Sequence, residues 1–375
     1  MKIAISGCLL QGGRSGIGSY IKGLINHLDQ MESEHTFDLY TYLEDVPLIR
    51  NPLERTTLRL VSSLLKHPIL NIVWHNSLLP LRLASHRTDL LHIPSLRRIP
   101  LVKSTRLIAT VHDMAPCAMK NKYDRLREFY HLQVLRRLVH RCDRIITVSY
   151  STKQDLIKYT DYPEEKIQVI YSGIDQKIFQ PIKKTVAKAY VEEKFGLSFP
   201  YFIYVSRLEH PGKNHVKLIE AFELFHQSNK EFGLHLIFVG AEWSGSSTIF
   251  ERAQRSPLKS LIHFLNFVPF DSLPYLYNAA EAMIFPSLYE GFGFPLLEAM
   301  ACGIPVACSE TTALGEIGKK HAVLFNPNQI DDIAHALNHV LQVPKNQLEF
   351  NRSYAASFSW KKTAEQTLDQ YRCLI

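Results

Sequence analysis

The chain has 375 residues, 46% of them hydrophobic and 21% charged, with a formal net charge of +7. These values indicate an ordinary globular protein of two domains, each able to bury its own core. No apolar run reaches the roughly 18 residues that a membrane span needs, and the N-terminus enters a strand pattern directly, so we expect neither a transmembrane helix nor a signal peptide. The six cysteines form no Cys-x-x-Cys pair, which favours reduced thiols in a cytoplasmic protein over a disulfide framework or a zinc site.

A candidate phosphate-binding loop follows the first predicted strand. Residues 2–6 alternate as a strand, and a glycine-containing loop separates them from an amphipathic helix over about 19–28. Such a loop is a Rossmann-like phosphate arrangement. The dinucleotide fingerprint is incomplete, because Ile21 stands where a third small residue should follow Gly16 and Gly18. We therefore expect no nicotinamide cofactor.

Strand and helix patterns alternate through the rest of the first half, which predicts a parallel sheet covered on both faces. His92 and the pair His112-Asp113 end two of the strands. Because ligands bind at that edge of open α/β sheets, His112 is the best candidate for a functional histidine and His92 the next. The predicted strands are 36–42, 89–93, 105–111, 143–148 and 167–170, and the predicted helices are 69–84 and 122–141.

The segment from Arg50 to Arg106 is strongly basic. It holds ten Lys or Arg against two acids, Glu54 and Asp89, together with many apolar residues between 64 and 79. Basic and apolar residues together are typical of a segment that lies on an anionic membrane surface. A buried helix followed by a solvated basic loop would explain the same composition. No nucleic-acid-binding motif accompanies the charge, so we expect no nucleic acid as a partner.

A second domain begins after a charged, linker-like stretch, and we predict the boundary near 181. A strand at 201–205 ends in Ser206-Arg207, and a short loop brings Lys213 to the start of a helix that runs to about 225. Two cations so placed would bind a diphosphate, Arg207 as a planar fork and Lys213 as a mobile point charge. Further strands are predicted at 234–240 and 262–269, and further helices at 273–280, 333–341 and 361–373.

The most informative stretch lies between residues 282 and 307. A buried strand is followed by a glycine loop, a short helix that ends at Gly303 and another strand. The loop can bring backbone N–H groups close to a phosphate, and the helix start adds its positive dipole end. Glu290 and Glu298 bracket the loop. A solvated glutamate would explain either one alone, but not the whole string Glu290-Gly291-Phe292-Gly293-Phe294-Pro295-Leu296.

This string, with its Glu-x7-Glu spacing and the Arg-x5-Lys pair upstream, resembles retaining GT-B glycosyltransferases of family 4. The resemblance covers nearly the whole chain. It implies an α/β protein of two Rossmann-like domains that face each other across a donor/acceptor cleft. The acceptor-binding domain would span 1–181 and the nucleotide-sugar-binding domain 182–355, and a C-terminal helix over 356–375 would cross back to the first domain.

The resemblance also implies how the donor is bound. Arg207 and Lys213 would hold the diphosphate, and Glu298 would accept hydrogen bonds from the ribose. Val268 would contact the nucleobase, although Asn266 stands where the family more often has glycine. The remaining donor-binding residues would be Gly16, Glu290, Gly291, Phe292, Gly293, Phe294, Pro295 and Leu296.

For the sugar and the acceptor, the resemblance implies a separate set of residues. Glu290 would hold sugar hydroxyls and face the developing oxocarbenium ion, and His112 would hydrogen-bond the transferred sugar. His92 and Asp113 would line the acceptor cleft. The catalytic residues would be His112, Arg207, Lys213 and Glu290.

No metal ion or other cofactor is expected, because the chain has no Asp-x-Asp motif and the resemblance implies a metal-independent reaction. The segments around Arg207 and Glu290 look most like transferases that build bacterial surface polysaccharide and lipopolysaccharide, many of which use GDP-mannose; UDP-sugars stay open. The acceptor would be a glycan or lipid-linked glycan, and the enzyme would be cytoplasmic or peripheral at the inner membrane.

Three other functions fit parts of the chain. A GT-B sugar-nucleotide epimerase would interconvert UDP-sugars without an acceptor. An inactive homologue would act as a scaffold. A protein that had lost its activity would be expected to lose some of the motif residues, and all of them are present in this chain. A nicotinamide oxidoreductase would need the complete dinucleotide-binding fingerprint, which this chain lacks at Ile21.

Overall fold

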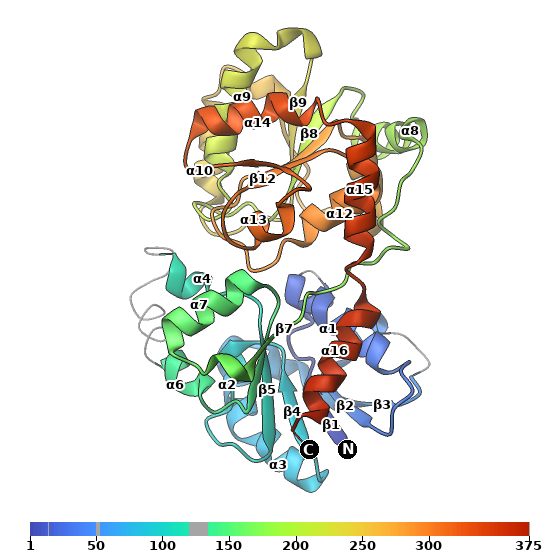
Figure 1. Cartoon of the computed structure of the whole chain (residues 1–375), viewed down its shortest axis with the longest axis vertical. Helices are drawn as coiled ribbons and strands as arrows, with labels where there is room; N and C mark the ends of the chain where they lie inside the picture. Colours follow the sequence, from blue (N-terminus) through green and yellow to red (C-terminus); the bar gives the residue numbers. More distant parts are fainter. Residues whose placement is uncertain (14, 50–52, 120–133, 375) are drawn as a thin grey trace. The chain divides into compact units, whose positions relative to one another are not determined.

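The fold is described from a computed structural model that covers residues 1–13, 15–49, 53–119 and 134–374 (Figure 1). Residues 122–133 of the predicted helix 122–141 lie outside this part of the chain, and so do the first three residues of the basic segment at 50–106. Within the described residues, α6 (Leu135–Val139) accounts for the end of that predicted helix.

The chain forms two compact units: unit 1 is Met1–Gly173 with Phe358–Ile375, and unit 2 is Ile174–Ser357. The divisions therefore fall after residues 173 and 357, where the sequence suggested 181 and 355. Packing explains the first difference. A Cβ on Gly173 would lie 2.1 Å from the backbone nitrogen of Trp360 in unit 1, whereas Phe179 packs its ring against Phe270 of unit 2, with the centroids 5.3 Å apart.

Unit 1 is built on a parallel seven-stranded sheet in the order β3-β2-β1-β4-β5-β6-β7. The central strands are buried almost throughout, as expected of a sheet covered on both faces. The chain order reverses between β1 and β4, which places the ligand-binding switch point there. The strands are β1 (Lys2–Ser6), β2 (Thr36–Tyr42), β3 (Thr56–Val61), β4 (Leu90–Ile93), β5 (Arg106–Val111), β6 (Arg144–Thr147) and β7 (Ile167–Val169).

The helices of unit 1 include the C-terminal one, which lies beside α1 (Figure 1). Its Trp360 ring occupies the space that a side chain at Gly23 would need, since a Cβ there would be 2.3 Å from the indole. The predicted helix 69–84 is two helices, separated at Ser77, whose hydroxyl donates to the carbonyl of Val73 (2.7 Å). The α-helices are α1 (Gly16–Leu28), α2 (Pro68–Asn76), α3 (Leu78–Ser85), α4 (Ala115–Ala118), α6, α7 (Tyr150–Thr160) and α16 (Trp360–Arg372).

Unit 2 repeats this architecture with a parallel six-stranded sheet in the order β10-β9-β8-β11-β12-β13. The order again reverses beside the first strand, so its switch point lies between β8 and β11. The two sheets confirm the predicted α/β class. The strands are β8 (Tyr201–Val205), β9 (His235–Val239), β10 (Ile262–Phe264), β11 (Ala282–Phe285), β12 (Val306–Ser309) and β13 (Val323–Phe325).

The helix of unit 2 that matters most is α12 (Phe294–Cys302). It ends at Gly303 in the left-handed conformation (φ 77°), as predicted. No helix in the described part of the chain is long and apolar enough to cross a membrane. The other α-helices are α8 (Lys184–Phe195), α9 (His215–Ser228), α10 (Ser246–Gln254), α11 (Leu273–Ala279), α13 (Thr312–Gly318), α14 (Ile330–Val340) and α15 (Lys345–Ala356).

Candidate active site

Residues predicted to bind the phosphates and the sugar of the donor lie at the switch point of unit 2. Arg207 and Lys213 lie in the loop after β8, and Glu290 lies in the loop after β11. The two loops are joined by a backbone hydrogen bond from Leu288 N to the carbonyl of Gly212 (3.0 Å). Neighbouring parallel strands thus bring together side chains that are far apart in the sequence.

Lys213 and Glu290 form an ion pair, with Lys213 Nζ 2.6 Å from Glu290 Oε1. The two side chains are 15% and 16% exposed, so they are partly shielded yet accessible. The Ser287 hydroxyl donates to the same carboxylate oxygen (2.7 Å). Among the described residues, nothing donates to Oε2 of Glu290, which leaves an acceptor for a ligand hydroxyl.

Tyr204 supports the Lys213–Glu290 pair through its hydroxyl, a role that the sequence analysis did not predict. The phenol of this fully buried β8 residue donates to the carbonyl of Lys213 (2.9 Å) and lies 3.0 Å from Ser287 Oγ. Tyr204, Ser287, Glu290 and Lys213 therefore form a closed ring of contacts. The sequence does hold one indication of this role, since Tyr204 lies inside an apolar strand that is expected to be buried. A buried phenol needs a hydrogen-bond partner.

A third loop, after β12, fixes the backbone at Glu290. The amide of Glu290 donates to Thr312 Oγ1 (3.1 Å), and its carbonyl accepts from Ala313 N (3.3 Å). The neighbouring Thr311 hydroxyl donates to the carbonyl of Leu288 (3.2 Å). The glutamate is thus held through both its backbone and its side chain.

Arg207 lies outside this ring and is half exposed. Its Nη2 is 3.2 Å from Glu209 Oε2, and its guanidinium lies over the indole of Trp243, 4.8 Å from the ring centre. Such a stack restrains the guanidinium plane while its N–H edge stays available. Trp243 was not predicted, and it is exposed in the loop after β9.

Backbone pairing places Trp243 against Arg207. Leu208 donates to the carbonyl of Ala241 (2.9 Å) and accepts from Trp243 N (3.1 Å). This approach requires glycine at 240, because a Cβ there would lie 1.9 Å from the carbonyl oxygen of Ser206. The loops after β8 and β9 are therefore joined, and the stacking partner of Arg207 is part of the fold.

The glycine loop and α12 form the other side of the site. Gly293 is the residue before the helix, with φ 113°, and offers no side chain to the first N–H groups of α12. A Cβ there would also lie 2.8 Å from Leu314. Phe292 is buried against Phe294, with ring centroids 5.0 Å apart, while Phe294 and Pro295 are partly exposed and Gly291 and Leu296 are buried.

Glu298 is buried on the first turns of α12. Tyr277 of α11 donates a hydrogen bond to its Oε2 (3.1 Å). Burial raises the pKa of the Glu298 carboxyl to about 7, although the hydrogen bond from Tyr277 opposes the shift. Because this pKa lies above the ordinary value of 4.5, the unfolded chain loses the proton of Glu298 at a lower pH than the folded chain does. The contribution of Glu298 to the free energy of unfolding is therefore fully present below pH 4.5 and is lost as the pH rises through about 7.

Replacing Glu298 by glutamine should abolish this loss, since glutamine does not titrate. We expect the free energy of unfolding of Glu298→Gln, relative to wild type, to rise by about 2–3 kcal/mol between pH 5 and pH 8. Urea denaturation at the two pH values measures it. Tyr277→Phe, which removes the opposing hydrogen bond, should steepen the wild-type dependence. A difference that does not change with pH would contradict a raised pKa.

The predicted nucleobase contact, Val268, follows β10 and is buried. Asn266, where the resemblance led us to expect glycine, adopts a left-handed φ of 50°. Its carbonyl accepts from Gly240 N (2.7 Å), which links this loop to the one that carries Trp243. Asparagine tolerates this conformation better than most residues other than glycine.

In unit 1, Gly16 begins the helix that follows β1, and His112 begins the loop that follows β5. Gly16 is the exposed first residue of α1, and Ser15 caps the helix by accepting from Gly18 N (3.1 Å). His112 follows β5 directly. Burial lowers the pKa of its ring to about 4, against the opposing effects of Asp113 and the Pro94 backbone, so the imidazole is neutral at pH 7.

The two predicted acceptor-cleft residues differ in their environments. Asp113 is exposed and accepts from Ala115 N (3.0 Å). His92 is fully buried, and both ring nitrogens are used internally: Nδ1 lies 2.6 Å from the Tyr371 hydroxyl and Nε2 lies 2.7 Å from Thr110 Oγ1. The expectation that His92 lines an open cleft therefore needs correction, because a histidine satisfied on both sides joins β4 and β5 to α16.

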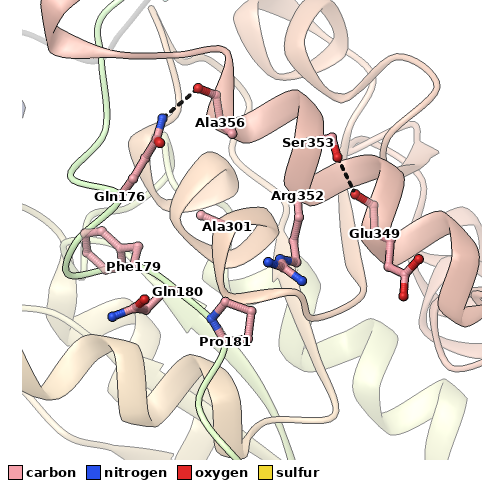
Figure 2. A pocket seen from close by; sticks show the side chains of 9 residues that line it. All are labelled: Gln176, Phe179, Gln180, Pro181, Ala301, Glu349, Arg352, Ser353 and Ala356. Carbon is pink, nitrogen blue, oxygen red and sulfur yellow. Dashed lines mark hydrogen bonds between the residues drawn. The ribbon is translucent and has the colours of Figure 1, made fainter.

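A cavity of about 500 Å³ in unit 2 lies away from these residues (Figure 2). It lies between the segment at 176–181 and α15, and Ala301 of α12 forms part of its wall. The guanidinium of Arg352 points into it in Figure 2, whereas the Glu349 carboxylate points away. None of the predicted donor-binding residues lines this cavity, so we do not assign the donor to it. Among the described residues, no three His, Cys, Asp or Glu side chains cluster as metal ligands would.

Comparison with known proteins identifies the family. The model described as Glycosyltransferase Family 4 matches residues 14–177, and the model described as Glycosyl transferases group 1 matches residues 190–356. O-antigen chain mannosyltransferase B of Escherichia coli is 28% identical over 96% of this chain and 96% of its own length. O-antigen chain mannosyltransferase RfbU of Salmonella typhimurium is 29% identical over 70% of this chain and 67% of its own length.

The fold agrees with this assignment. The structure of Anabaena HepE in complex with UDP and glucose matches 99% of this chain and 99% of its own with a TM-score of 0.77, at 18% identity. That likeness concerns the fold alone, which is GT-B. Because the two family models together account for most of both units, the chain is a glycosyltransferase that combines a Glycosyltransferase Family 4 domain with a Glycosyl transferases group 1 domain.

Proposed function

We propose that the enzyme is a retaining, metal-independent hexosyltransferase that moves mannose from GDP-mannose to a glycan or lipid-linked glycan. It would act in the cytoplasm, in the synthesis of a cell-surface polysaccharide such as lipopolysaccharide. The observation that carries the proposal is the Lys213–Glu290 pair at the switch point of unit 2, with Arg207 in the same loop as Lys213.

The cations would bind the donor diphosphate. Cleavage of a glycosyl phosphate builds negative charge on the leaving oxygen, and positioned cations stabilise that charge. Lys213, now paired with Glu290 at 2.6 Å, would share its charge with the phosphate, while Arg207 would offer the guanidinium edge left available by the Trp243 stack. These two side chains would supply the charge that other transferases obtain from a metal ion.

Glu290 would face the sugar. Its Oε1 is held by Lys213 and Ser287, so Oε2 is left to accept a hydrogen bond from a sugar hydroxyl and to stabilise positive character at the anomeric carbon. In a retaining reaction the C–O bond to the diphosphate breaks, the acceptor oxygen bonds to the same face of the sugar, and the departing phosphate takes the acceptor proton. A neutral His112 would hydrogen-bond the sugar without adding charge.

The donor and pathway rest on the relatives. Both O-antigen mannosyltransferases support mannose as the sugar and a surface polysaccharide as the product, at 28% and 29% identity. A UDP-sugar is the alternative donor, since no described side chain distinguishes guanine from uracil. An epimerase or a scaffold would not transfer sugar at all.

Product analysis tests the proposal. With GDP-mannose and EDTA, we expect release of GDP and a product of the same anomeric configuration as the donor, observed by proton NMR before mutarotation. An inverted product would contradict retention, and loss of turnover with EDTA would contradict metal independence. If UDP-glucose turned over faster than GDP-mannose, we would conclude that the donor is a UDP-sugar.

A further inference from the structure

Tyr20 of α1 contacts the histidine that follows β5. Its phenol ring meets the imidazole of His112 in a T-shaped contact, with the ring centroids 4.8 Å apart and the planes at 80°. Nε2 of His112 is shielded from solvent and has no hydrogen-bond partner among the described residues. The direction in which this nitrogen points therefore depends on what packs against the ring. In the described part of the chain, Tyr20 is the one aromatic side chain that does so.

The hydroxyl of Tyr20 is fixed by a residue of the same strand. It lies 3.0 Å from Thr110 Oγ1, and both side chains are fully buried. Thr110 and His112 are two residues apart, so their side chains leave the chain on the same side. A buried phenol keeps the position in which its hydroxyl is bonded, because a buried hydroxyl without a partner is costly. One side chain of α1 thus contacts both Thr110 and His112.

The hydrogen bond at Thr110 continues to the C-terminal helix. His92 Nε2 lies 2.7 Å from Thr110 Oγ1, and His92 Nδ1 lies 2.6 Å from the Tyr371 hydroxyl of α16. Burial lowers the pKa of the His92 ring to about 3, so the ring is neutral and can donate through one nitrogen and accept through the other. The hydrogen-bond chain from α1 to α16 is fully buried and consists of Tyr20, Thr110, His92 and Tyr371.

Helix α16 also contacts the ring of Tyr20 directly. The indole of Trp360 packs against this ring, with the centroids 6.2 Å apart and the planes at 66°. The same indole fills the space beside Gly23 of α1, and the two helices lie side by side in Figure 1. The beginning of α16 therefore supports the ring of Tyr20, and the end of α16 supports its hydroxyl through Tyr371.

We propose that Tyr20 is a positioning residue for His112. Its ring sets the orientation of the imidazole, and the hydrogen-bond chain keeps the phenol from moving away. Helix α16 is the support, through the Trp360 ring and through Tyr371. A sugar at His112 would then meet a ring whose orientation is fixed before binding. The positioning rests on contacts within unit 1, whereas its consequence for turnover rests on the proposed function.

The resonance of His112 tests the positioning independently of activity. In the full chain labelled with carbon-13 at histidine Cε1, the signal of His112 is the one that His112→Gln removes. Burial lowers the pKa of this ring to about 4, so the wild-type signal should not shift between pH 5.5 and pH 8. Tyr20→Leu opens the ring to water, and its signal should titrate in this range as the pKa rises toward 6.5. Tyr20→Phe keeps the ring and should leave the signal unchanged.

A double-mutant cycle tests the consequence for the reaction. Tyr20→Leu should lower kcat about tenfold, the upper value of one aromatic contact. Tyr20→Phe and Tyr371→Phe, which break the hydrogen-bond chain at its two ends, should lower kcat about threefold each. In a His112→Ala background, Tyr20→Leu should change kcat by less than about twofold, because its effect passes through the imidazole.

Tyr162→Leu is the matched control. Tyr162 is a buried tyrosine of unit 1, and it donates to the carbonyl of Cys142 (2.9 Å). Cys142 precedes the amino end of β6, whereas His112 follows the carboxyl end of β5. Tyr162→Leu should therefore keep both the wild-type kcat and the wild-type signal of His112.

The outcomes separate the positioning from the proposed function. A His112 signal in Tyr20→Leu that does not shift with pH overturns the inference, and so does a Tyr162→Leu variant in which His112 titrates equally. An equal loss of kcat in the wild-type and His112→Ala backgrounds overturns it as well. Wild-type kcat in Tyr371→Phe, beside a loss in Tyr20→Leu, overturns the part assigned to α16.

A failure of the proposed function would look different. If His112 titrates in Tyr20→Leu but neither Tyr20→Leu nor His112→Ala changes kcat, the positioning stands and His112 has no part in the reaction. If the enzyme transfers no mannose at all, the titration of the His112 signal alone decides the inference.

Discussion

Replacing Lys213 by alanine is expected to lower kcat by roughly 10²–10³. The lysine offers the one ammonium that contacts Glu290 among the described residues, at 2.6 Å. Without it, the leaving diphosphate loses a positioned cation, and the carboxylate of Glu290 keeps, among the described residues, only its hydrogen bond from Ser287. The loss should appear mainly in kcat, because the charge on the leaving oxygen is largest in the transition state.

Lys217→Ala is the matched control for this variant. Lys217 lies four residues after Lys213, in the first turn of α9, and donates to the carbonyl of Asn328 (2.8 Å) instead of to Glu290. Its removal should leave kcat within a few-fold of wild type. If Lys213→Ala is as active as Lys217→Ala, Lys213 has no part in the reaction.

Arg207→Ala should cost a similar factor, roughly 10²–10³ in kcat. Arg207→Lys should recover part of the activity, because an ammonium keeps the charge but lacks the planar fork. Trp243→Ala tests the stack separately: we expect a loss of about 2–5-fold in kcat/KM, the value of a cation–π contact at an exposed site. Steady-state kinetics with the donor varied measure all three.

The control for Trp243 is Phe232→Ala. Phe232 is an exposed aromatic residue just before β9, at the opposite end of that strand from Trp243. It should behave as wild type. An Arg207→Ala enzyme within a few-fold of wild type would remove Arg207 from the donor site, and a Trp243→Ala loss in an Arg207→Ala background would show that the indole acts otherwise than through Arg207.

Local sequence patterns predicted the central strands because these are buried on both faces and read as continuous apolar runs, as β11 and β5 do. They missed β3, an edge strand that pairs only with β2 and leaves Leu60 exposed. An edge strand lacks the second buried face that makes a central one recognisable. The single helix predicted at 69–84 failed for a different reason, since Ser77 interrupts a pattern that is apolar on both sides of it.

The motif residues of the site could be named from spacing, but their partners could not. Tyr204, Ser287 and Thr312 come from three strand ends that only the sheet order brings together. His92 shows the converse. Its place at a strand end suggested a ligand contact, but Tyr371 of the distant α16 satisfies one of its nitrogens.

Calorimetric titration of the purified enzyme with GDP and with UDP, in EDTA, tests the central claim most directly. We predict micromolar binding of GDP at one site and weaker binding by Glu298→Ala, whose carboxylate would hold the ribose. Tight binding of UDP but not of GDP would show that the donor is a UDP-sugar and not GDP-mannose. Binding of neither nucleotide would contradict a donor site at Arg207, Lys213 and Glu290, and would leave the scaffold as the better description of this chain.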